Sequence, residues 1–237
     1  MGQSYFIWNG KDCRSMGVRL RGPVPIVRPE ERVKHIQLQG VSGDLTQLEG
    51  DQIYNSYIQT ATMHVTGWEN VREVFNWLKG SGFVTFSGEP DRMQSARIIG
   101  AVTLNKHSKN MDVWSGEVQF YCQPLKQKLT QETTEITSSG KLIVNTGDVD
   151  EKPLILMTAS GTSAVIDAGG RTLTMTGLTS SHKYWIDCAA MDILNNGMSA
   201  SLLSGASGAF PILPPGTNKI LGSGWSKLEI TRRERFL

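Results

Sequence analysis

Alternation of apolar and polar residues with a period of two runs through most of the chain and predicts strands joined by turns. The first such run, Ser4 to Trp8, is followed by Asn9-Gly10, a dipeptide typical of two-residue hairpin turns. A longer run extends from Tyr54 to Val65. One face of that run is apolar along its length and carries Tyr57, Ala61, Met63 and Val65.

Two long runs, Gln94 to Asn105 and Asp112 to Gln123, flank a polar HSKN segment and predict a hairpin. We expect Pro124 to end the second strand, because proline cannot donate a hydrogen bond to a ladder. One face of the second run carries Trp114, Val118, Phe120 and Cys122.

The segment WENVREVFNWLKG breaks the strand pattern and predicts a helix. Thr66 and Glu69 stand three residues apart, as in a capping box, and Gly80 follows as a helix stop. We expect the apolar stripe to pack on a sheet, because an isolated helix of this length is marginally stable in water. The stripe comprises Trp68, Val71, Val74, Phe75 and Leu78.

A polar, Thr- and Ser-rich connector, residues 126–140, separates two regions and predicts an N-terminal domain over 1–128 and a C-terminal domain over 129–237. Many short strands without helices favour a β-sandwich for the second domain. FPILPPGTNKI would form the last crossing before the final strand, with Leu213 and Ile220 as core anchors. The expected strands are Lys141–Asn145, Pro153–Ala159, Ser163–Ile166, Thr172–Thr176, Tyr184–Asp187 and Trp225–Thr231.

The fold class expected from these patterns is mainly β. An N-terminal β-sandwich or barrel-like domain with one α-helix would be followed by a β-sandwich domain. With 39% hydrophobic and 19% charged residues, the chain can build packed cores. Its net charge of only +2 is not the strong overall positive charge typical of nucleic-acid-binding proteins, so we expect no nucleic-acid specificity.

Cysteine usage and the N-terminus bear on the compartment. Cys13, Cys122 and Cys188 are scattered without a CxxC motif, which argues against a disulfide framework or a zinc cage and suits a reducing cytoplasm. The opening MGQSYFIWNGKD lacks the basic head and apolar run of a signal peptide. No apolar run approaches the roughly 18 residues of a membrane span, so no membrane association is expected.

Catalytic motifs are missing from the sequence: it has no GxSxG, P-loop, GxGxxG or HExxH. We therefore expect no enzyme activity, no catalytic residue, no metal site and no cofactor. Cys188 is interpreted as a small buried hydrophobic residue. The acidic cluster Asp148, Asp150 and Glu151 is interpreted as a solvated turn rather than a calcium loop. The end TRRERF is interpreted as a solvated or interface-pairing strand end rather than a nucleic-acid arm.

Taken in order, these segments resemble the distal tail proteins (Dit) of long, non-contractile-tailed phages. In the N-terminal half the similar pieces are YFIWNGKD, RPEERVKHI, GVSGDLTQLEGD, WLKGSGFVTFSGEPDRMQSARI and EVQFYCQPLKQ. In the C-terminal half, YWIDCAAMDILNN, GAFPILPPGTNKI and the final RRERFL look like the galectin-like domain found in many members.

The resemblance implies a structural protein of the virion, assembled in the host cytoplasm at the phage tail tip. It implies a homohexameric ring made by the N-terminal domains, with galectin-like C-terminal domains projecting outward. The implied partners are other copies of the chain, the tail tube protein, and the tail-tip hub or tail-associated lysin protein. The tape measure and receptor-binding proteins are further candidates.

Two charged stretches, 28–34 and 44–51, are candidate ring contacts. We expect them to be loops whose opposite charges meet on adjacent subunits in a head-to-tail interface. If both were only solvated, they would play no part in assembly. The candidate interface residues are Arg28, Glu30, Glu31, Arg32, Asp44, Glu49 and Asp51.

A carbohydrate-binding module is the alternative function, since galectin-like sandwiches often bind sugars through a tryptophan and polar residues. Trp185 and Asn195 would serve that site. The compact His, Asn, Arg and Trp group of a true galectin site is not present in the second domain. A third possibility, a tail-associated hydrolase, is disfavoured by the missing catalytic motifs.

Overall fold

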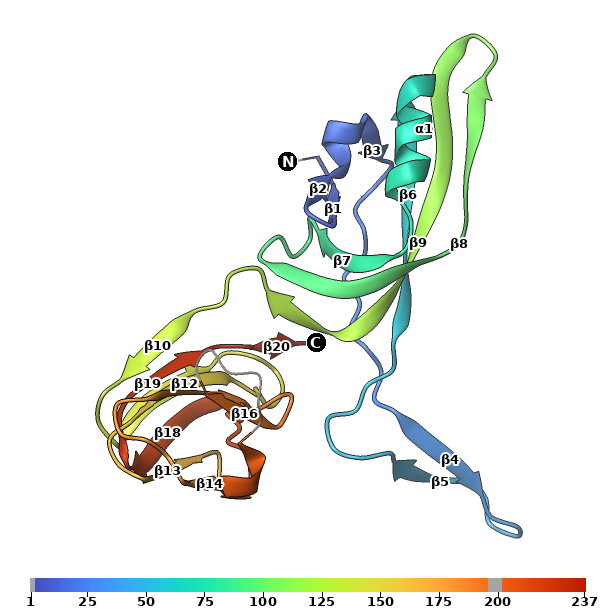
Figure 1. Ribbon diagram of the computed structural model, residues 1–237. Helices are drawn as coiled ribbons and strands as arrows, with labels where there is room; N and C mark the ends of the chain where they lie inside the picture. Colours follow the sequence, from blue (N-terminus) through green and yellow to red (C-terminus); the bar gives the residue numbers. More distant parts are fainter. Residues whose placement is uncertain (1–2, 196–201) are drawn as a thin grey trace. The chain divides into compact units, whose positions relative to one another are not determined.

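The computed structural model describes residues 3–195 and 202–237 of the chain (Figure 1). The chain divides into two compact units, Met1–Leu129 together with Leu237, and Thr130–Phe236. Antiparallel strands make up most of both units, and the described residues contain one α-helix. The mainly-β fold class with a single helix is confirmed.

The N-terminal unit is built on one antiparallel sheet in the order β2-β1-β7-β8-β9-β6-β3. Its longest strands are β8 and β9, which form the predicted hairpin. Outside the sheet lie the 3-10 turn η1 (Cys13–Met16) and the helix α1 (Trp68–Trp77). The strands are β1 (Phe6–Trp8), β2 (Lys11–Asp12), β3 (Val18–Leu20), β6 (Tyr57–Thr66), β7 (Ser81–Phe86), β8 (Arg92–Ser108) and β9 (Met111–Lys128).

The turn between β1 and β2 is the two-residue hairpin turn that the sequence predicts. Asn9 and Gly10 both have positive φ, 50° and 77°, as a type I′ turn requires. Trp8 and Lys11 pair directly across it.

Pro124 does not end β9, which continues to Lys128, so that prediction is wrong. The ladder is interrupted instead. Gln94 pairs with Lys126 and Ala96 with Cys122, so a single residue of β8 lies opposite the three residues 123–125 of β9. Pro124 lies inside this bulge, where a residue without an N–H is tolerated.

Helix α1 packs against the inner face of the sheet through Val71, Val74 and Leu78, all of them buried. Trp77 stacks on Phe6 with ring centroids 5.5 Å apart. The other two members of the predicted stripe, Trp68 and Phe75, are 55% and 41% exposed, because the contact with the sheet is narrower than the stripe.

The predicted capping box does not form. Thr66 is still the last residue of β6, and Gly67 takes the N-cap position without a side-chain cap. Asp112 of the neighbouring strand substitutes for it, since its Oδ2 accepts from the N–H of Trp68 at 3.1 Å. Gly80 follows the helix with φ of 77°, as its role as a helix stop predicts.

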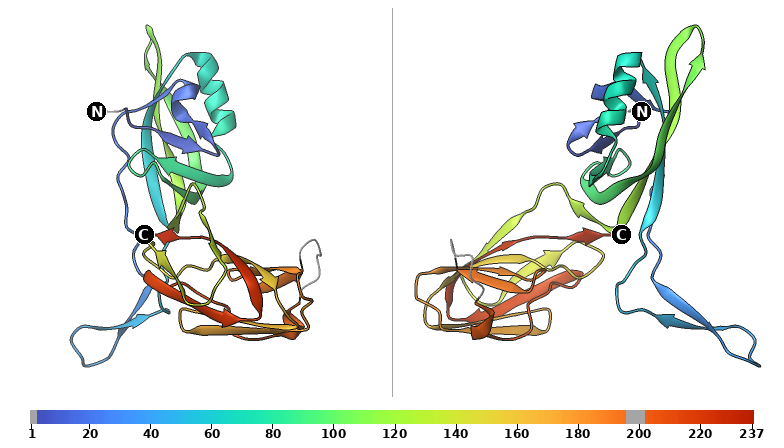
Figure 2. Two further views of the ribbon diagram at one scale, coloured as in Figure 1. Left: turned by 90° about the vertical axis from the view of Figure 1, so that its left-hand side faces the viewer. Right: turned by 45° about the vertical axis from the view of Figure 1, so that its right-hand side comes forward.

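A two-stranded ribbon, β4 (Val33–Gln37) and β5 (Asp44–Leu48), projects from this unit away from its main sheet (Figures 1 and 2). The ladder runs from Val33 opposite Leu48 to Gln37 opposite Asp44. The sequence places a loop over 44–51, and the structure corrects this: Asp44–Leu48 is a strand. The alternation in DLTQL is too short to identify a strand without its partner β4.

The C-terminal unit is a sandwich of two five-stranded sheets, β10-β19-β12-β15-β16 and β11-β18-β13-β14-β17. Further elements are the 3-10 turn η2 (Leu203–Gly205) and the short strand β20 (Arg235–Phe236). The strands of the first sheet are β10 (Thr133–Ile136), β12 (Leu154–Ala159), β15 (Lys183–Asp187), β16 (Asp192–Asn195) and β19 (Trp225–Thr231). Those of the second are β11 (Lys141–Asn145), β13 (Ser163–Ala168), β14 (Arg171–Thr176), β17 (Ala206–Gly208) and β18 (Gly216–Ser223).

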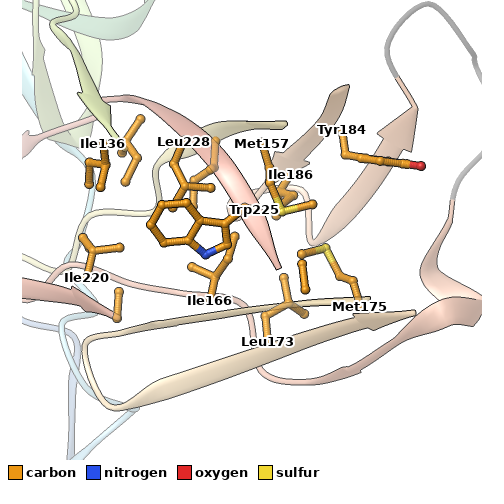
Figure 3. Close-up of a cluster of buried hydrophobic side chains, with 14 of the residues drawn as sticks. Ile136, Met157, Ile166, Leu173, Met175, Tyr184, Ile186, Ile220, Trp225 and Leu228 are labelled. Carbon is orange, nitrogen blue, oxygen red and sulfur yellow. The ribbon is translucent and has the colours of Figure 1, made fainter. Parts of the chain in front are cut away.

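The core of the sandwich lies between the two sheets (Figure 3). Trp225 lies among Ile166 and Ile220 of one sheet and Leu228 of the other, and its Nε1 donates to the Val165 carbonyl at 3.2 Å. Leu213 and Ile220 are 0% and 1% exposed, so their prediction as core anchors is confirmed.

The segment FPILPPGTNKI is only partly a turn. Asn218 Nδ2 donates to the Pro214 and Gly216 carbonyls at 2.8 and 3.0 Å and so stabilises the turn. From Gly216 onward, however, the chain is strand β18, which pairs with both β11 and β13. The connector likewise contains strand β10, which pairs with β19.

Candidate functional site

All seven charged residues proposed as ring contacts are exposed, and they lie on the β4–β5 ribbon or its base. Glu49 follows β5, and its N–H donates to the Arg32 carbonyl at 3.1 Å. Arg32 Nε also donates to Asn55 Oδ1 at 3.2 Å. The structure therefore brings the two charged stretches side by side within one chain.

The ribbon and its base together carry more negative than positive charge. Five of the seven candidate residues are carboxylates: Glu30, Glu31, Asp44, Glu49 and Asp51. Arg28 and Arg32 are the two cations among the seven. None of the seven forms an ion pair within 4.0 Å of another residue in the described part of the chain. Within β4 and β5 themselves Lys34 balances Asp44, so the surplus of negative charge lies at the base of the ribbon.

Large apolar side chains are exposed along the same ribbon. Leu45 is 55% and Leu48 60% exposed, and at the connecting turn Leu38 is 50% and Val41 61% exposed. A two-stranded hairpin without a packed face is at best marginally stable in water. Exposed apolar residues of this kind are typical of a surface that packs against another protein.

One member of the acidic cluster, Glu151, is not solvated as expected but forms a buried ion-pair network with the C-terminal segment, whereas Asp148 is exposed. Glu151 is 0% exposed, and its carboxylate accepts from Arg232 Nη2 at 2.6 Å and from the Arg233 N–H at 2.6 Å. Arg232 Nη2 also donates to Glu234 Oε1 at 3.0 Å. Burial alone would lower the pKa of Arg232, but the hydrogen bond and charge of Glu151, with the charge of Glu234, outweigh it and raise the pKa.

A second pair joins Arg233 to Asp187 at 2.7 Å. Burial alone would raise the pKa of Asp187, but the hydrogen bond from Arg233 and the N–H groups of Ala190 and Ala189 lower it. Together the two pairs tie the chain near 150 and strand β15 to the segment after β19. These ion pairs hold together segments of the sandwich that are far apart in the sequence.

The three cysteines are buried and unpaired. Burial raises the pKa of Cys188 to about 12, and it packs in the core of the sandwich, as the sequence interpretation holds. Burial raises the pKa of Cys122 to about 12 as well, and it also raises the pKa of Cys13. A thiol in this state is a poor nucleophile.

His64 and His107, far apart in the sequence, come together on β6 and β8 with ring centroids 6.5 Å apart. His64 Nδ1 lies 3.0 Å from Ser115 Oγ. No cluster of three or more His, Cys, Asp or Glu side chains suited to a metal ion occurs within residues 3–195 and 202–237.

The two residues of the alternative sugar site lie on opposite faces of one sheet. Tyr184 pairs with Asn195 and Trp185 with Leu194, and the buried residues Tyr184 and Ile193 mark the inner face. Because side chains alternate along a strand, Trp185 faces outward and Asn195 inward. Their side chains do not converge on one surface.

Trp185 lines a hollow of about 320 Å³ on the outer face of the sheet. Strands β12, β15 and β16 build this hollow, which the sequence alone did not indicate, since its residues come from separate strands between Leu154 and Leu194. The other residues lining it are Leu154, Asp187, Ala190, Asp192 and Leu194.

No family model matches the sequence, and no curated protein matches it. Among solved structures, the chain is similar to the Dit (gp 19.1) protein of phage SPP1, with a TM-score of 0.79 and 18% identity over 100% of both chains. That structure is described as a paradigm of the hub adsorption apparatus in phages that infect Gram-positive hosts. A second similar chain comes from the baseplate of phage p2 in its activated conformation with strontium, with a TM-score of 0.49, 11% identity and 98% and 97% coverage.

The mainly-β fold of the chain is thus one already seen in a phage protein. More particularly, the chain is similar in fold to the SPP1 Dit protein over its full length. The resemblance in fold that the sequence indicates is therefore confirmed. In the described part of the chain, no helix has the length and apolar character of a membrane span.

Proposed function

We propose that this protein is a structural, non-catalytic component of a phage tail tip. It forms a homohexameric ring that connects the tail tube to the tail-tip hub and the receptor-binding apparatus. The observation that carries the proposal is the end-to-end correspondence with the SPP1 Dit fold, which spans both units. The virion is accordingly its proposed location.

In this proposal the N-terminal unit, residues 1–128, makes the ring, and the C-terminal unit, residues 129–237, projects from it as a galectin-like domain. The exposed apolar ribbon of the N-terminal unit, with its acidic base, supports the ring role, because such a surface needs a partner. Proposed partners besides further copies are the tail tube protein and the hub or tail-associated lysin protein. The tape measure and receptor-binding proteins are also proposed partners.

Light scattering coupled to size exclusion tests the ring directly. A hexamer has six times the chain mass of 26.1 kDa, and electron microscopy of that peak would show rings. A mass of one chain over the whole accessible concentration range would contradict self-assembly. Arg32→Glu reverses one of the two candidate cations and should weaken the ring; an unchanged hexamer would remove Arg32 from the interface.

Saccharide binding is a second candidate, favoured by the hollow around Trp185. The aromatic face of Trp185 can stack on a sugar ring. The carboxylates of Asp187 and Asp192 beside it can accept hydrogen bonds from the sugar hydroxyl groups. On a glycan array, Trp185→Ala should abolish any signal that the wild-type chain gives. Asn195→Ala, on the opposite face, is the matched control, and an array without signal would remove this candidate.

A further inference from the structure

Strand β6 has an edge that its neighbour β3 covers only in part. The paired residues run from Val18 opposite Val65 to Leu20 opposite Met63. One further bond follows, from the Arg21 N–H to the Thr62 carbonyl at 2.9 Å. Beyond Arg21 the segment is not a strand, although β6 continues back to Tyr57.

Two prolines account for the end of this ladder. Continued in the same register, Pro23 would lie opposite Thr60 and Pro25 opposite Ile58. Neither proline has an N–H to donate, so the ladder cannot extend. The segment turns instead onto the inner face of the sheet, where Val24 is buried and Gln59 Nε2 donates to the Pro25 carbonyl.

The backbone groups of Ile58 and Thr60 therefore point to an open side. In an antiparallel ladder, alternate residues face the same neighbour. Thr62 and Thr66 bond to the β3 side, through Arg21 and Gly17, so Thr60 and Ile58 face that side too. A groove of about 330 Å³ between Arg21–Pro25 and Thr60–Thr62 gives access to Thr60.

The surroundings of this edge are basic and apolar. Arg19 and Arg21 are exposed, and neither forms an ion pair with another described residue. On the outer face Ile58, 53% exposed, pairs with Tyr121, 41% exposed. An open edge beside exposed apolar residues is a template for another strand.

The β4–β5 ribbon has the complementary properties. The N–H of Glu49 bonds across to the β4 side, and in an antiparallel pair every second residue does so. The backbone groups of the intervening residues Asp44, Thr46 and Leu48 therefore face away from β4. All five residues of β5 are exposed, and the ribbon pairs with no other strand among the described residues. The surplus of carboxylates at its base, Glu30, Glu31, Glu49 and Asp51, is opposite in charge to the arginines that flank the β6 edge.

We propose that β5 of one copy of this chain adds to the open edge of β6 in a second copy, extending its sheet across the subunit boundary. This β-augmentation gives main-chain hydrogen bonds, with the Ile58 and Leu48 side chains and the opposite charges adding specificity. The contact joins two different surfaces, so it is head-to-tail and can be repeated around a closed ring. It rests on the proposed self-assembly and identifies the strands that mediate it.

Cross-linking between two single-cysteine variants tests the pairing. The native cysteines are buried, so a short bismaleimide reaches only the engineered thiols. Mixing Thr46→Cys with Thr60→Cys should give a covalent dimer on a denaturing gel. The matched control mixes Thr46→Cys with Thr103→Cys, an exposed position of the same sheet on the interior strand β8, and should give none.

A second pair of variants separates pairing from folding. Thr60→Pro removes the outward N–H but no bond of the β6–β9 ladder, whereas Thr60→Val keeps the N–H. Thr60→Pro should lose the assembled peak in light scattering, and Thr60→Val should keep it. Circular dichroism of both confirms that the sheet is folded.

The outcomes distinguish this inference from the ring itself. An assembled wild-type chain that gives no 46–60 cross-link, or a Thr60→Pro variant that assembles like Thr60→Val, would overturn the strand pairing and leave the ring standing. A wild-type chain that stays at 26.1 kDa would overturn the ring and the pairing together.

Discussion

Arg232 Nε donates to both carboxylate oxygens of Glu151, at 2.9 and 3.0 Å, although the two residues are 81 positions apart. The pair is buried, with side chains 8% and 0% exposed. It connects the loop before β12 to the segment after β19, two strands that pair directly in the sheet. This buried contact therefore stabilises the sandwich and does not form a ligand-binding site.

Removing one partner of this pair should destabilise the C-terminal unit strongly. Glu151→Gln leaves Arg232 buried with its main counter-ion gone, and breaking a buried pair in this way costs about 3–5 kcal/mol. Urea unfolding, with hydrogen exchange of β12 and β19 amides, measures the loss. Glu229→Gln, which removes one partner of the more exposed Lys227, is the control and should have a much smaller effect.

The stability of the sandwich should depend on pH through Asp187. Its pKa is lowered from 3.8 in the folded state, so the ionised carboxylate stabilises the fold above about that pH. This contribution is lost as the pH falls through the lower, folded pKa. The difference in unfolding free energy between wild type and Asp187→Asn should therefore be largest at neutral pH and should disappear in acid. A difference that does not change with pH would contradict this role.

The thiols should be inert in the folded chain. At about pH 8.5 a free cysteine is half ionised, but burial holds the pKa of Cys122 and Cys188 at about 12 and raises that of Cys13. A colorimetric thiol reagent should therefore detect none of the three thiols before denaturation and all three afterwards. Rapid labelling of the native chain would show that one of the buried positions opens.

The turn between β18 and β19 should not accept a side chain at Gly224. Its φ is 77°, and a Cβ there would lie 2.0 Å from the Ser163 carbonyl oxygen. Gly224→Ala should cost at least the roughly 1–2 kcal/mol of left-handed strain, with the clash added, in thermal unfolding. Gly161→Ala, at an open position without positive φ, should be neutral or slightly stabilising.

Sequence patterns predicted the elements that carry their own signal. The β1–β2 turn follows from Asn9-Gly10, the long hairpin from two alternating runs, and α1 from its helical spacing. The strands missed were those whose pattern is short or interrupted by proline and glycine, such as β5 and β18. Their strand conformation depends on pairing with β4 in one case and with β11 and β13 in the other.

The candidate sites show the same division. The sequence indicated the charged ribbon residues, because the charges stand close together along the chain. It did not show that Glu151 neutralises Arg232, that Trp185 and Asn195 face opposite ways, or that Trp68 stays exposed. Each of these depends on which strand lies next to which.

The sequence by itself determined the mainly-β class, the helix and the local turns, because each rests on neighbouring residues and their intrinsic backbone preferences. Only the tertiary structure decided which charges are buried, which strand edges are open and which aromatic side chains face solvent. Pro23 and Pro25 show the difference. Their fixed φ and missing N–H can be read from the chain, but the β6 edge that they leave open is apparent only once the register of β3 and β6 is known.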